Sequence, residues 1–270
     1  MEQRAEEKPV TLYSQESLKQ NMEKIGIRPG MTLIVHSSYK AIGHVVGGPV
    51  AVILALEEAL GETGTLVMPT FTEHLRDLAE EENHRPESQC ELVRQHLPLY
   101  YPDLTPVDRH NGILTELFRK QQGVLRSAHP HLSFAAWGKH AQKIIEHHSF
   151  NNALGQQSPI ARIYNLQGYV LLFGAPRDTN SSLHLSEYRQ NSMNITPRVW
   201  DALMMVDGKR TWAQYHDIVN NSDIFPQILD AFLHHSDACR TGKIGDAESY
   251  FMSQPEIADF GVEWLNDHHR

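Results

Sequence analysis

The sequence lacks the features that are typical of secreted and membrane-spanning proteins. Only two cysteines, Cys90 and Cys239, occur in 270 residues, and their wide separation favours reduced thiols over a structural disulfide. No apolar run approaches the roughly 20 residues that cross a bilayer. Residues 1–10 are charged and lack the apolar stretch of a signal peptide. We therefore expect a cytoplasmic protein with no membrane partner.

Clusters of basic residues are also absent. The formal net charge is −9, and no run of lysines or arginines occurs. Binding to the phosphates of nucleic acids needs a clustered basic surface, so nucleic acid is excluded as a partner. A modest negative field favours a cationic small molecule instead. The seventeen histidines are unusually many and raise the question of a metal site.

Helical and strand patterns alternate along the chain, which predicts an α/β fold. The first half gives, in order, a helix over 14–25, a strand over 32–36, a helix over 49–60 that begins at Pro49, and a strand over 65–68. A strand, a helix and a second strand in this order predict a parallel pair with a crossover helix. Residues 74–108 are irregular, with one short helix near 91–96, and fit either a substrate lid or a solvated insertion.

The second half continues the alternation of helix and strand patterns and adds a hairpin near the C-terminus. It gives a helix over 141–148 with His147 and His148 at its end, a buried strand over 169–173, a hairpin around Asp207-Gly208 and a helix over 255–265. Asp-Gly between two apolar runs is a strong signal for a tight β-hairpin. We therefore expect one domain over residues 1–270, with a mixed central sheet and an added antiparallel hairpin near the C-terminus.

The loop over 36–48 has the features of an anion site. It follows a strand end, carries Ser37 and Ser38, and closes with Gly47 and Gly48 just before a helix. Free backbone N–H groups and the helix dipole favour phosphate at such a position. The loop matches neither the Walker motif nor the dinucleotide-binding motif, and a simple tight turn explains it equally.

Two histidines at alternate positions, His129 and His131, flank Pro130. Such a pair can contribute to a zinc site together with a third ligand, and His184 is the histidine that could supply it. A metal-dependent hydrolase is therefore one hypothesis. The two side chains fit equally well as polar groups hydrogen-bonded within a loop.

A second histidine motif follows the buried strand over 169–173. If Ser181 or Ser182 caps a helix there, His184 and Glu187 stand at positions i and i+3 on one face. An imidazole beside a carboxylate has the two parts of a general base, one to take a proton and one to orient the ring. A simple surface pair on a helix is the alternative.

These motifs occur together in three blocks, over 31–72, 111–138 and 155–187. Their most informative segments read VHSSYKAIGHVVGGP at 35–49, NGILTELF at 111–118, RSAHPHLS at 126–133 and NSSLHLSE at 180–187. In content and order the blocks resemble the aminoglycoside 3-N-acetyltransferase family, and the likeness runs from about residue 10 to 250. The chromosomal bacillus-type members are the most similar.

The resemblance implies a three-layer α/β/α fold, acetyl-CoA as the cosubstrate and no metal. It assigns donor binding to His36, Ser37, Ser38, Gly47, Gly48 and Ser133. It assigns the catalytic base to His184, with Glu187 in the same motif and Glu116 as a further carboxylate that orients a base or holds the amine.

The implied reaction is transfer of an acetyl group to the amine of a small, cationic, aminoglycoside-like acceptor. Direct transfer within a ternary complex is the simplest mechanism, because both cysteines lie outside the matched blocks. Two alternatives stay open, namely the metal-dependent hydrolase and a CoA-binding protein without catalysis. A monomer and a homodimer both stay open as well.

Overall fold

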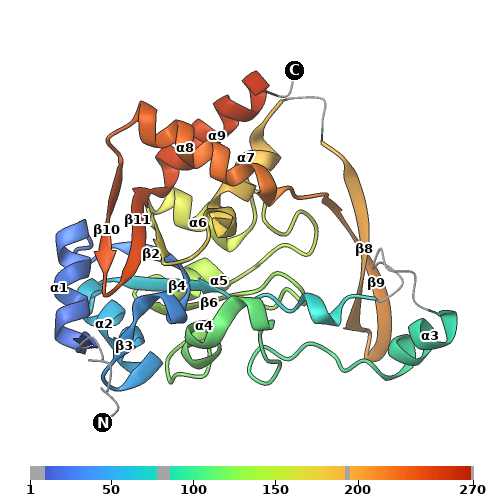
Figure 1. The fold of residues 1–270 in the computed structure, drawn as a ribbon. Helices are drawn as coiled ribbons and strands as arrows, with labels where there is room; N and C mark the ends of the chain where they lie inside the picture. Colours follow the sequence, from blue (N-terminus) through green and yellow to red (C-terminus); the bar gives the residue numbers. More distant parts are fainter. Residues whose placement is uncertain (1–9, 78–85, 192–194, 269–270) are drawn as a thin grey trace, which may run out of the picture.

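The computed structural model describes residues 10–77, 86–191 and 195–268. Within these residues a central sheet has the strand order β10-β11-β7-β2-β4-β6-β5 (Figure 1). Its strands are β2 (Thr32–Ser37), β4 (Thr65–Pro69), β5 (Leu125–Arg126), β6 (Phe134–Gly138), β7 (Tyr169–Phe173), β10 (Cys239–Ile244) and β11 (Ala247–Ser253). The three central strands β7, β2 and β4 are parallel, and the outer strands are antiparallel to their neighbours. The predicted mixed sheet is confirmed.

The first parallel pair forms as the sequence predicts. Helix α1 (Gln15–Ile25) begins after Ser14, whose hydroxyl accepts the N–H of Ser17, and ends at Gly26 in a left-handed conformation. Strand β2 then leads through the loop into α2 (Gly48–Leu60) and on to β4, which pairs in parallel with β2. Helix α2 begins at Gly48, one residue before the expected Pro49.

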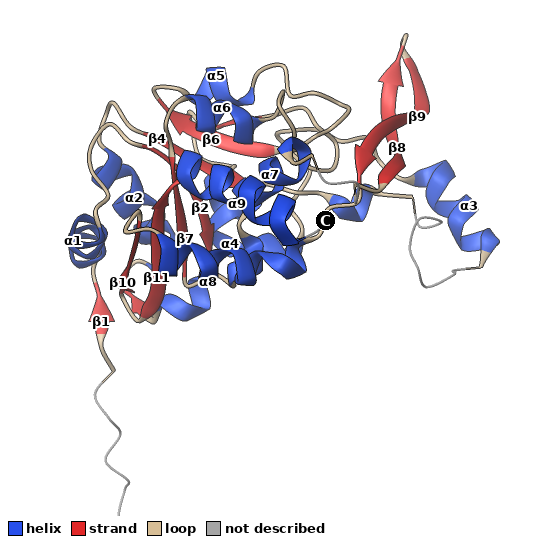
Figure 2. Ribbon diagram, turned by 90° about the horizontal axis from the view of Figure 1, so that it is seen from above, coloured by secondary structure: helices blue, strands red, loops and turns tan. Residues whose placement is uncertain are grey.

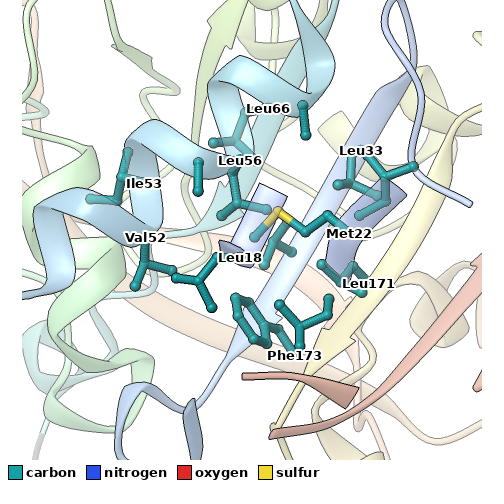
Figure 3. Packing of buried hydrophobic residues seen from close by; sticks show 14 of the residues in the cluster. Leu18, Met22, Leu33, Val52, Ile53, Leu56, Leu66, Leu171 and Phe173 are labelled. Carbon is teal, nitrogen blue, oxygen red and sulfur yellow. The ribbon is translucent and has the colours of Figure 1, made fainter. Parts of the chain in front are cut away.

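Alternate strand residues point to opposite sides of the sheet, so each face carries its own set of side chains. Helices pack against both faces. Leu33 and Leu171 face one side, where they pack with Met22 of α1 and Leu56 of α2 (Figure 3). The opposite face packs against four helices, α5 (Ala141–Ile145), α6 (Pro159–Asn165), α8 (Phe225–His235) and α9 (Gln254–His268). The chain therefore forms the expected three layers, which place the carboxyl ends of β2, β4 and β7 at one edge.

The predicted hairpin forms a separate two-stranded sheet. Strands β8 (Pro197–Val206) and β9 (Lys209–Ile218) are joined by Asp207 and Gly208, both with positive φ. Positive φ at both central residues is typical of a type I′ turn. The hairpin stands to one side of the central sheet, beside α3 (Glu87–His96), in both views (Figures 1 and 2). The indole N–H of Trp212 donates to the carbonyl of Arg94 in α3.

Two local expectations were wrong in detail. Helix α5 ends at Ile145, so His148 lies beyond it in a half-buried loop, where removal of the ring from water lowers its pKa to about 4. It is therefore a neutral hydrogen-bonding group and not a cation at a helix end. Helix α3 starts at Glu87, four residues before the expected helix. Part of the irregular segment, residues 78–85, lies outside the described residues.

Short elements complete the described chain. They are β1 (Leu12–Tyr13), which pairs in parallel with β3 (His44–Val45), and the helices α4 (Gly112–Phe118) and α7 (His184–Arg189). None of the helices in the described ranges has both the length and the hydrophobicity that crossing a bilayer requires.

Candidate active site

A cavity of about 870 Å³ opens at the carboxyl ends of the parallel strands. Strand β2 contributes Val35, His36 and Ser37, β4 contributes Pro69, and Ala175 follows β7. Open α/β sheets bind their ligands at this edge. The end of the β8–β9 hairpin and the loop after it form another part of the wall. The cavity is the candidate active site.

His184 enters the cavity from the start of α7. The side chain of Asn180 accepts the N–H of Ser182 and so starts a single 3-10 turn over 181–183, which runs directly into α7. The expected serine cap was wrong: Asn180 caps the 3-10 turn, and α7 continues from this turn after Leu183 without a side-chain cap of its own. This short turn places the imidazole at the cavity wall with 13% of the side chain exposed.

Glu187 lies beside His184 and is nearly buried. Its Oε2 lies 2.7 Å from Nδ1 of His184, and its Oε1 accepts the N–H of Asn221 at 2.7 Å. A carboxylate accepts hydrogen bonds, so the imidazole carries its proton on Nδ1 and leaves Nε2 as the basic nitrogen. The predicted pairing of His184 and Glu187 is confirmed as a contact.

Two more residues hold the imidazole, and no sequence motif indicated them. The side chain of Asn220 contacts Nδ1 at 3.1 Å without accepting or donating a second hydrogen bond there, because Nδ1–H is donated to Glu187, and the ring of Phe225 contacts the imidazole edge to face at 4.8 Å between centroids. Both belong to the segment after β9. Only the tertiary fold brings this segment against α7, more than thirty positions earlier in the chain.

His36 also lines the cavity. Burial, and then the neighbouring His184, lower its pKa to about 3. Its Nε2 accepts the N–H of Ser181 at 3.4 Å, so the proton of the neutral ring is on Nδ1. His36 is therefore a neutral ring that links β2 to the turn before α7 by accepting its N–H group. Ser37 and Ser38, predicted in the same loop, also line the cavity.

Gly47 and Gly48 lie at the N-terminus of α2 and do not line the cavity itself. Both have positive φ, of 86° and 67°, which explains why glycine stands there. A methyl group added at Gly48 would lie 3.8 Å from the hydroxyl of Tyr39, and Tyr39 lines the cavity. The start of α2 is thus close to the cavity wall.

Two further predicted residues, Ser133 and Glu116, do not line the cavity either. Ser133 is fully buried, where its hydroxyl donates to the carbonyl of Thr70 and accepts the Nε–H of Arg126. Glu116 is paired with Arg119 and Lys120. Although partial burial raises its pKa, the hydrogen bonds from these two cations prevail and lower it to about 2. Both residues stabilise the surrounding loops and lie apart from His184.

His129 and His131 do not form a metal site with His184. Nδ1 of His129 accepts the backbone N–H groups of His131 and Leu132, and Nδ1 of His131 is hydrogen-bonded to the hydroxyl of Tyr215. Both Nδ1 atoms are thus used within the fold, as the loop interpretation expected. In the described part of the chain, metal-ligand spacing occurs instead at Glu73, Asp108 and His110. The hydrolase hypothesis is therefore wrong in its proposed ligand set.

Comparison with known families decides the identity. Residues 34–266 match the family model for aminoglycoside 3-N-acetyltransferase. The chain belongs to this family. It is therefore an acetyltransferase, and the resemblance of its three sequence blocks is confirmed.

Similar acetyltransferases match over nearly their whole length. The SPbeta prophage-derived aminoglycoside N(3')-acetyltransferase-like protein YokD of Bacillus subtilis (strain 168) is 39% identical over 254 residues, which are 93% of this chain and 92% of YokD. The crystal structure of YokD gives a TM-score of 0.92 at 37% identity, covering 96% of this chain and 95% of YokD. The binary complex of AAC-IIIb with CoASH gives 0.87 at 26% identity, covering 96% and 98%. These matches confirm the expected fold.

Proposed function

We propose that this acetyltransferase moves the acetyl group of acetyl-CoA directly onto an amine of an aminoglycoside-like acceptor, with both substrates bound together. Acetyl-CoA is the cosubstrate of the family, and a structural neighbour is solved with CoASH. His184 acts as the general base and Glu187 orients it. The hydrogen bond between their side chains, at the wall of the cavity, is the observation that supports this assignment most strongly.

The chemistry follows from the charge of the acceptor. An amine is protonated near neutral pH and attacks the thioester carbonyl only after it has lost a proton. The bare Nε2 of His184 takes that proton, and Glu187 stabilises the imidazolium that forms. The attack creates an oxyanion. The N–H groups near Ser37 and the neutral His36 are the donors that could stabilise it from the end of β2.

The donor is proposed to bind between this strand end and the start of α2. Ser37 and Ser38 offer hydroxyl groups there, and the thirteen-residue helix α2 directs its free N–H groups toward the same region. The phosphates of coenzyme A would fit at Gly47 and Gly48. Neither cysteine of the chain lines the cavity, and direct transfer needs no acyl-enzyme intermediate on a thiol.

Replacement of His184 by alanine tests the proposal. We expect kcat to fall about 10²–10⁴-fold, the usual contribution of a general base. Affinity for acetyl-CoA, measured by calorimetry, should change little, because the base contacts the acceptor. His96→Ala removes an exposed histidine from α3 and serves as the control.

The assay is thiol release from acetyl-CoA with a panel of aminoglycosides and other amines. Near-normal turnover of His184→Ala would remove this residue from the mechanism. Binding of acetyl-CoA by the unaltered protein without thiol release for any amine would support the non-catalytic alternative.

A further inference from the structure

A short turn directly after β2 brings a tyrosine and a lysine to the cavity wall. Tyr39 and Lys40 begin a single 3-10 turn that ends at Ile42, and both side chains line the cavity. Ile42 is fully buried in the core, and its carbonyl accepts the N–H of Asp246. The end of the turn is therefore anchored in the fold, while its first two side chains stand at the cavity.

Lys40 is a cation that a ligand can reach. Its side chain is exposed, and within the described part of the chain no ion pair holds it. The two arginines of the cavity wall are engaged elsewhere, because Arg76 pairs with Glu73 and both Arg76 and Arg198 stack on the ring of Trp200. The charge of Lys40 is therefore the one that is left for an anion.

The hydroxyl of Tyr39 lies beside the N-terminus of α2. It is 3.8 Å from the position that a β-carbon at Gly48 would take, and no hydrogen bond from the described residues engages it. Gly48 is the first residue of α2, where the backbone N–H groups have no acceptor within the helix. A phenol hydroxyl can donate one further hydrogen bond. Free donors of two kinds thus lie next to each other, one residue before Lys40 in the chain.

The turn lies on the donor side of the proposed reaction. Helix α2 and the β8–β9 hairpin are on opposite sides of the molecule in both views (Figures 1 and 2), and Arg198 and Trp200 belong to the hairpin. Acetyl-CoA carries negative charge on its diphosphate and its 3′-phosphate, whereas an aminoglycoside-like acceptor carries positive charge. A free ammonium group attracts the first and repels the second. Lys40 therefore suits the donor and not the acceptor.

We propose that Lys40 and the hydroxyl of Tyr39 bind the phosphates of acetyl-CoA at the start of α2. Lys40 supplies the positive charge, and Tyr39 donates a hydrogen bond beside the first N–H groups of the helix. The sequence motifs assigned neither residue to donor binding. This inference rests on the proposed acetyl transfer and adds to its donor site the side chains that recognise phosphate.

Matched donors test the proposal by thiol release. Acetyl-CoA, its 3′-dephospho form and S-acetylpantetheine share one thioester and differ in their phosphates. In Lys40→Gln the KM of acetyl-CoA should rise about ten-fold, as for the loss of a hydrogen bond to a charged group, and that of S-acetylpantetheine should not change. A rise for the dephospho form as well assigns Lys40 to the diphosphate, and a rise for acetyl-CoA alone assigns it to the 3′-phosphate. The same change for all three donors, or no change, would overturn the proposal.

Further lysine variants separate the charge from the fold. Lys40→Arg keeps the positive charge and should keep most of the affinity for acetyl-CoA. Lys139→Gln is the matched control, because Lys139 is exposed and lies outside the cavity. Circular dichroism and Tm show whether each variant is folded. A rise in the acceptor KM of Lys40→Gln without a rise in that of acetyl-CoA would assign the lysine to the acceptor and contradict the inference.

The tyrosine is tested in the same way. Tyr39→Phe removes only the hydroxyl and should raise the KM of acetyl-CoA several-fold while that of S-acetylpantetheine stays the same. Tyr101→Phe is its control, because Tyr101 is 50% exposed and lies outside the cavity. Equal KM values for acetyl-CoA in these two variants would remove Tyr39 from the phosphate site.

Calorimetry separates failure of this inference from failure of acetyl transfer. If no amine releases thiol, the proposed function fails, and binding of CoA still tests the two residues. Binding that is about ten-fold weaker in Lys40→Gln than in Lys139→Gln supports the inference. Equal affinity in these two variants, or no binding of CoA to the unaltered protein, refutes it.

Discussion

Glu187 connects the imidazole of His184 to the chain segment after the hairpin. One carboxylate oxygen faces Nδ1 of His184, and the other accepts the N–H of Asn221. The backbone N–H of Asn221 can only donate, so the atom at position 187 that faces it must be an acceptor. If glutamine stood at this position, its carbonyl oxygen would therefore face Asn221. The residue thereby determines where the proton of His184 lies.

Glu187→Gln should reverse this arrangement. The carbonyl oxygen of the glutamine pairs with Asn221, which turns its NH₂ group toward Nδ1 of His184. Nδ1 must then accept, the proton moves to Nε2, and the base is lost. We expect kcat to fall about 10²–10⁴-fold, as for removal of a general base. Nitrogen-15 NMR of labelled histidine reports the tautomer, and exposed Glu256→Gln is the control. An unchanged tautomer with full activity would contradict this role.

Gly48 offers a residue-scale test of the donor site. Its φ is 67°, so an alanine is strained by about 1–2 kcal/mol whatever it contacts. Gly123→Ala is the matched control, because Gly123 has a φ of 84° with open space around it. Both variants should lower Tm by similar amounts. Only Gly48→Ala should raise the KM of acetyl-CoA several-fold, because its methyl group lies at the first N–H groups of α2. Equal KM values in the two variants would remove this turn from donor binding.

At the scale of elements, α7 is held in place by α9. The hydroxyl of Ser186 donates to the carbonyl of Ala258, and Gly261 of α9 lies directly against the same serine. A methyl group at Gly261 would lie 2.6 Å from Oγ of Ser186 and 3.0 Å from Cδ2 of Leu183. The glycine therefore permits the close approach that positions His184.

Gly261→Ala should destabilise the protein although alanine favours a helix by about 1 kcal/mol over glycine. We expect a lower Tm and a lower kcat, because α7 must move away from α9. The double variant with Ser186→Ala should recover part of both, since it removes the hydroxyl at 2.6 Å. Thermal unfolding and thiol release measure the two effects. A higher Tm for the single variant would show that the helices adjust freely.

The sequence predicted the elements whose pattern is local. Helix α1 has an apolar face, a serine cap and a terminal glycine, and the hairpin has Asp-Gly at its turn. It also predicted the contact between His184 and Glu187, because three positions along a helix bring side chains together. The contact of Asn220 with His184 was not predictable, because it joins segments that only the tertiary fold brings together. The assignment of Ser133 to donor binding stays a prediction, and its buried hydrogen bonds with Thr70 and Arg126 were not predictable because a motif carries no information on burial.

At the scale of the whole molecule, three buried histidines and the half-buried His148 are held in a neutral state. Burial lowers the pKa of His36 and His131 to about 3 and that of His148 to about 4, and it holds the pKa of His129 well below its usual range. Unfolding exposes all four rings to water, where the ordinary pKa is 6.5. Below pH 6.5 the unfolded chain therefore binds protons that the folded chain does not bind.

This difference sets the sign of the pH dependence of stability. The free energy of unfolding should be highest above pH 6.5 and fall as the pH decreases from 6.5 to about 4, by about 1.4 kcal/mol per pH unit for each histidine. His148→Asn should reduce this slope by about one proton, whereas His96→Asn should leave it unchanged because His96 is exposed. Urea denaturation at several pH values measures the slope. Parallel curves for His148→Asn and the unaltered protein would show that His148 takes up its proton without unfolding, and removal of the ring from water could then not be what keeps it neutral.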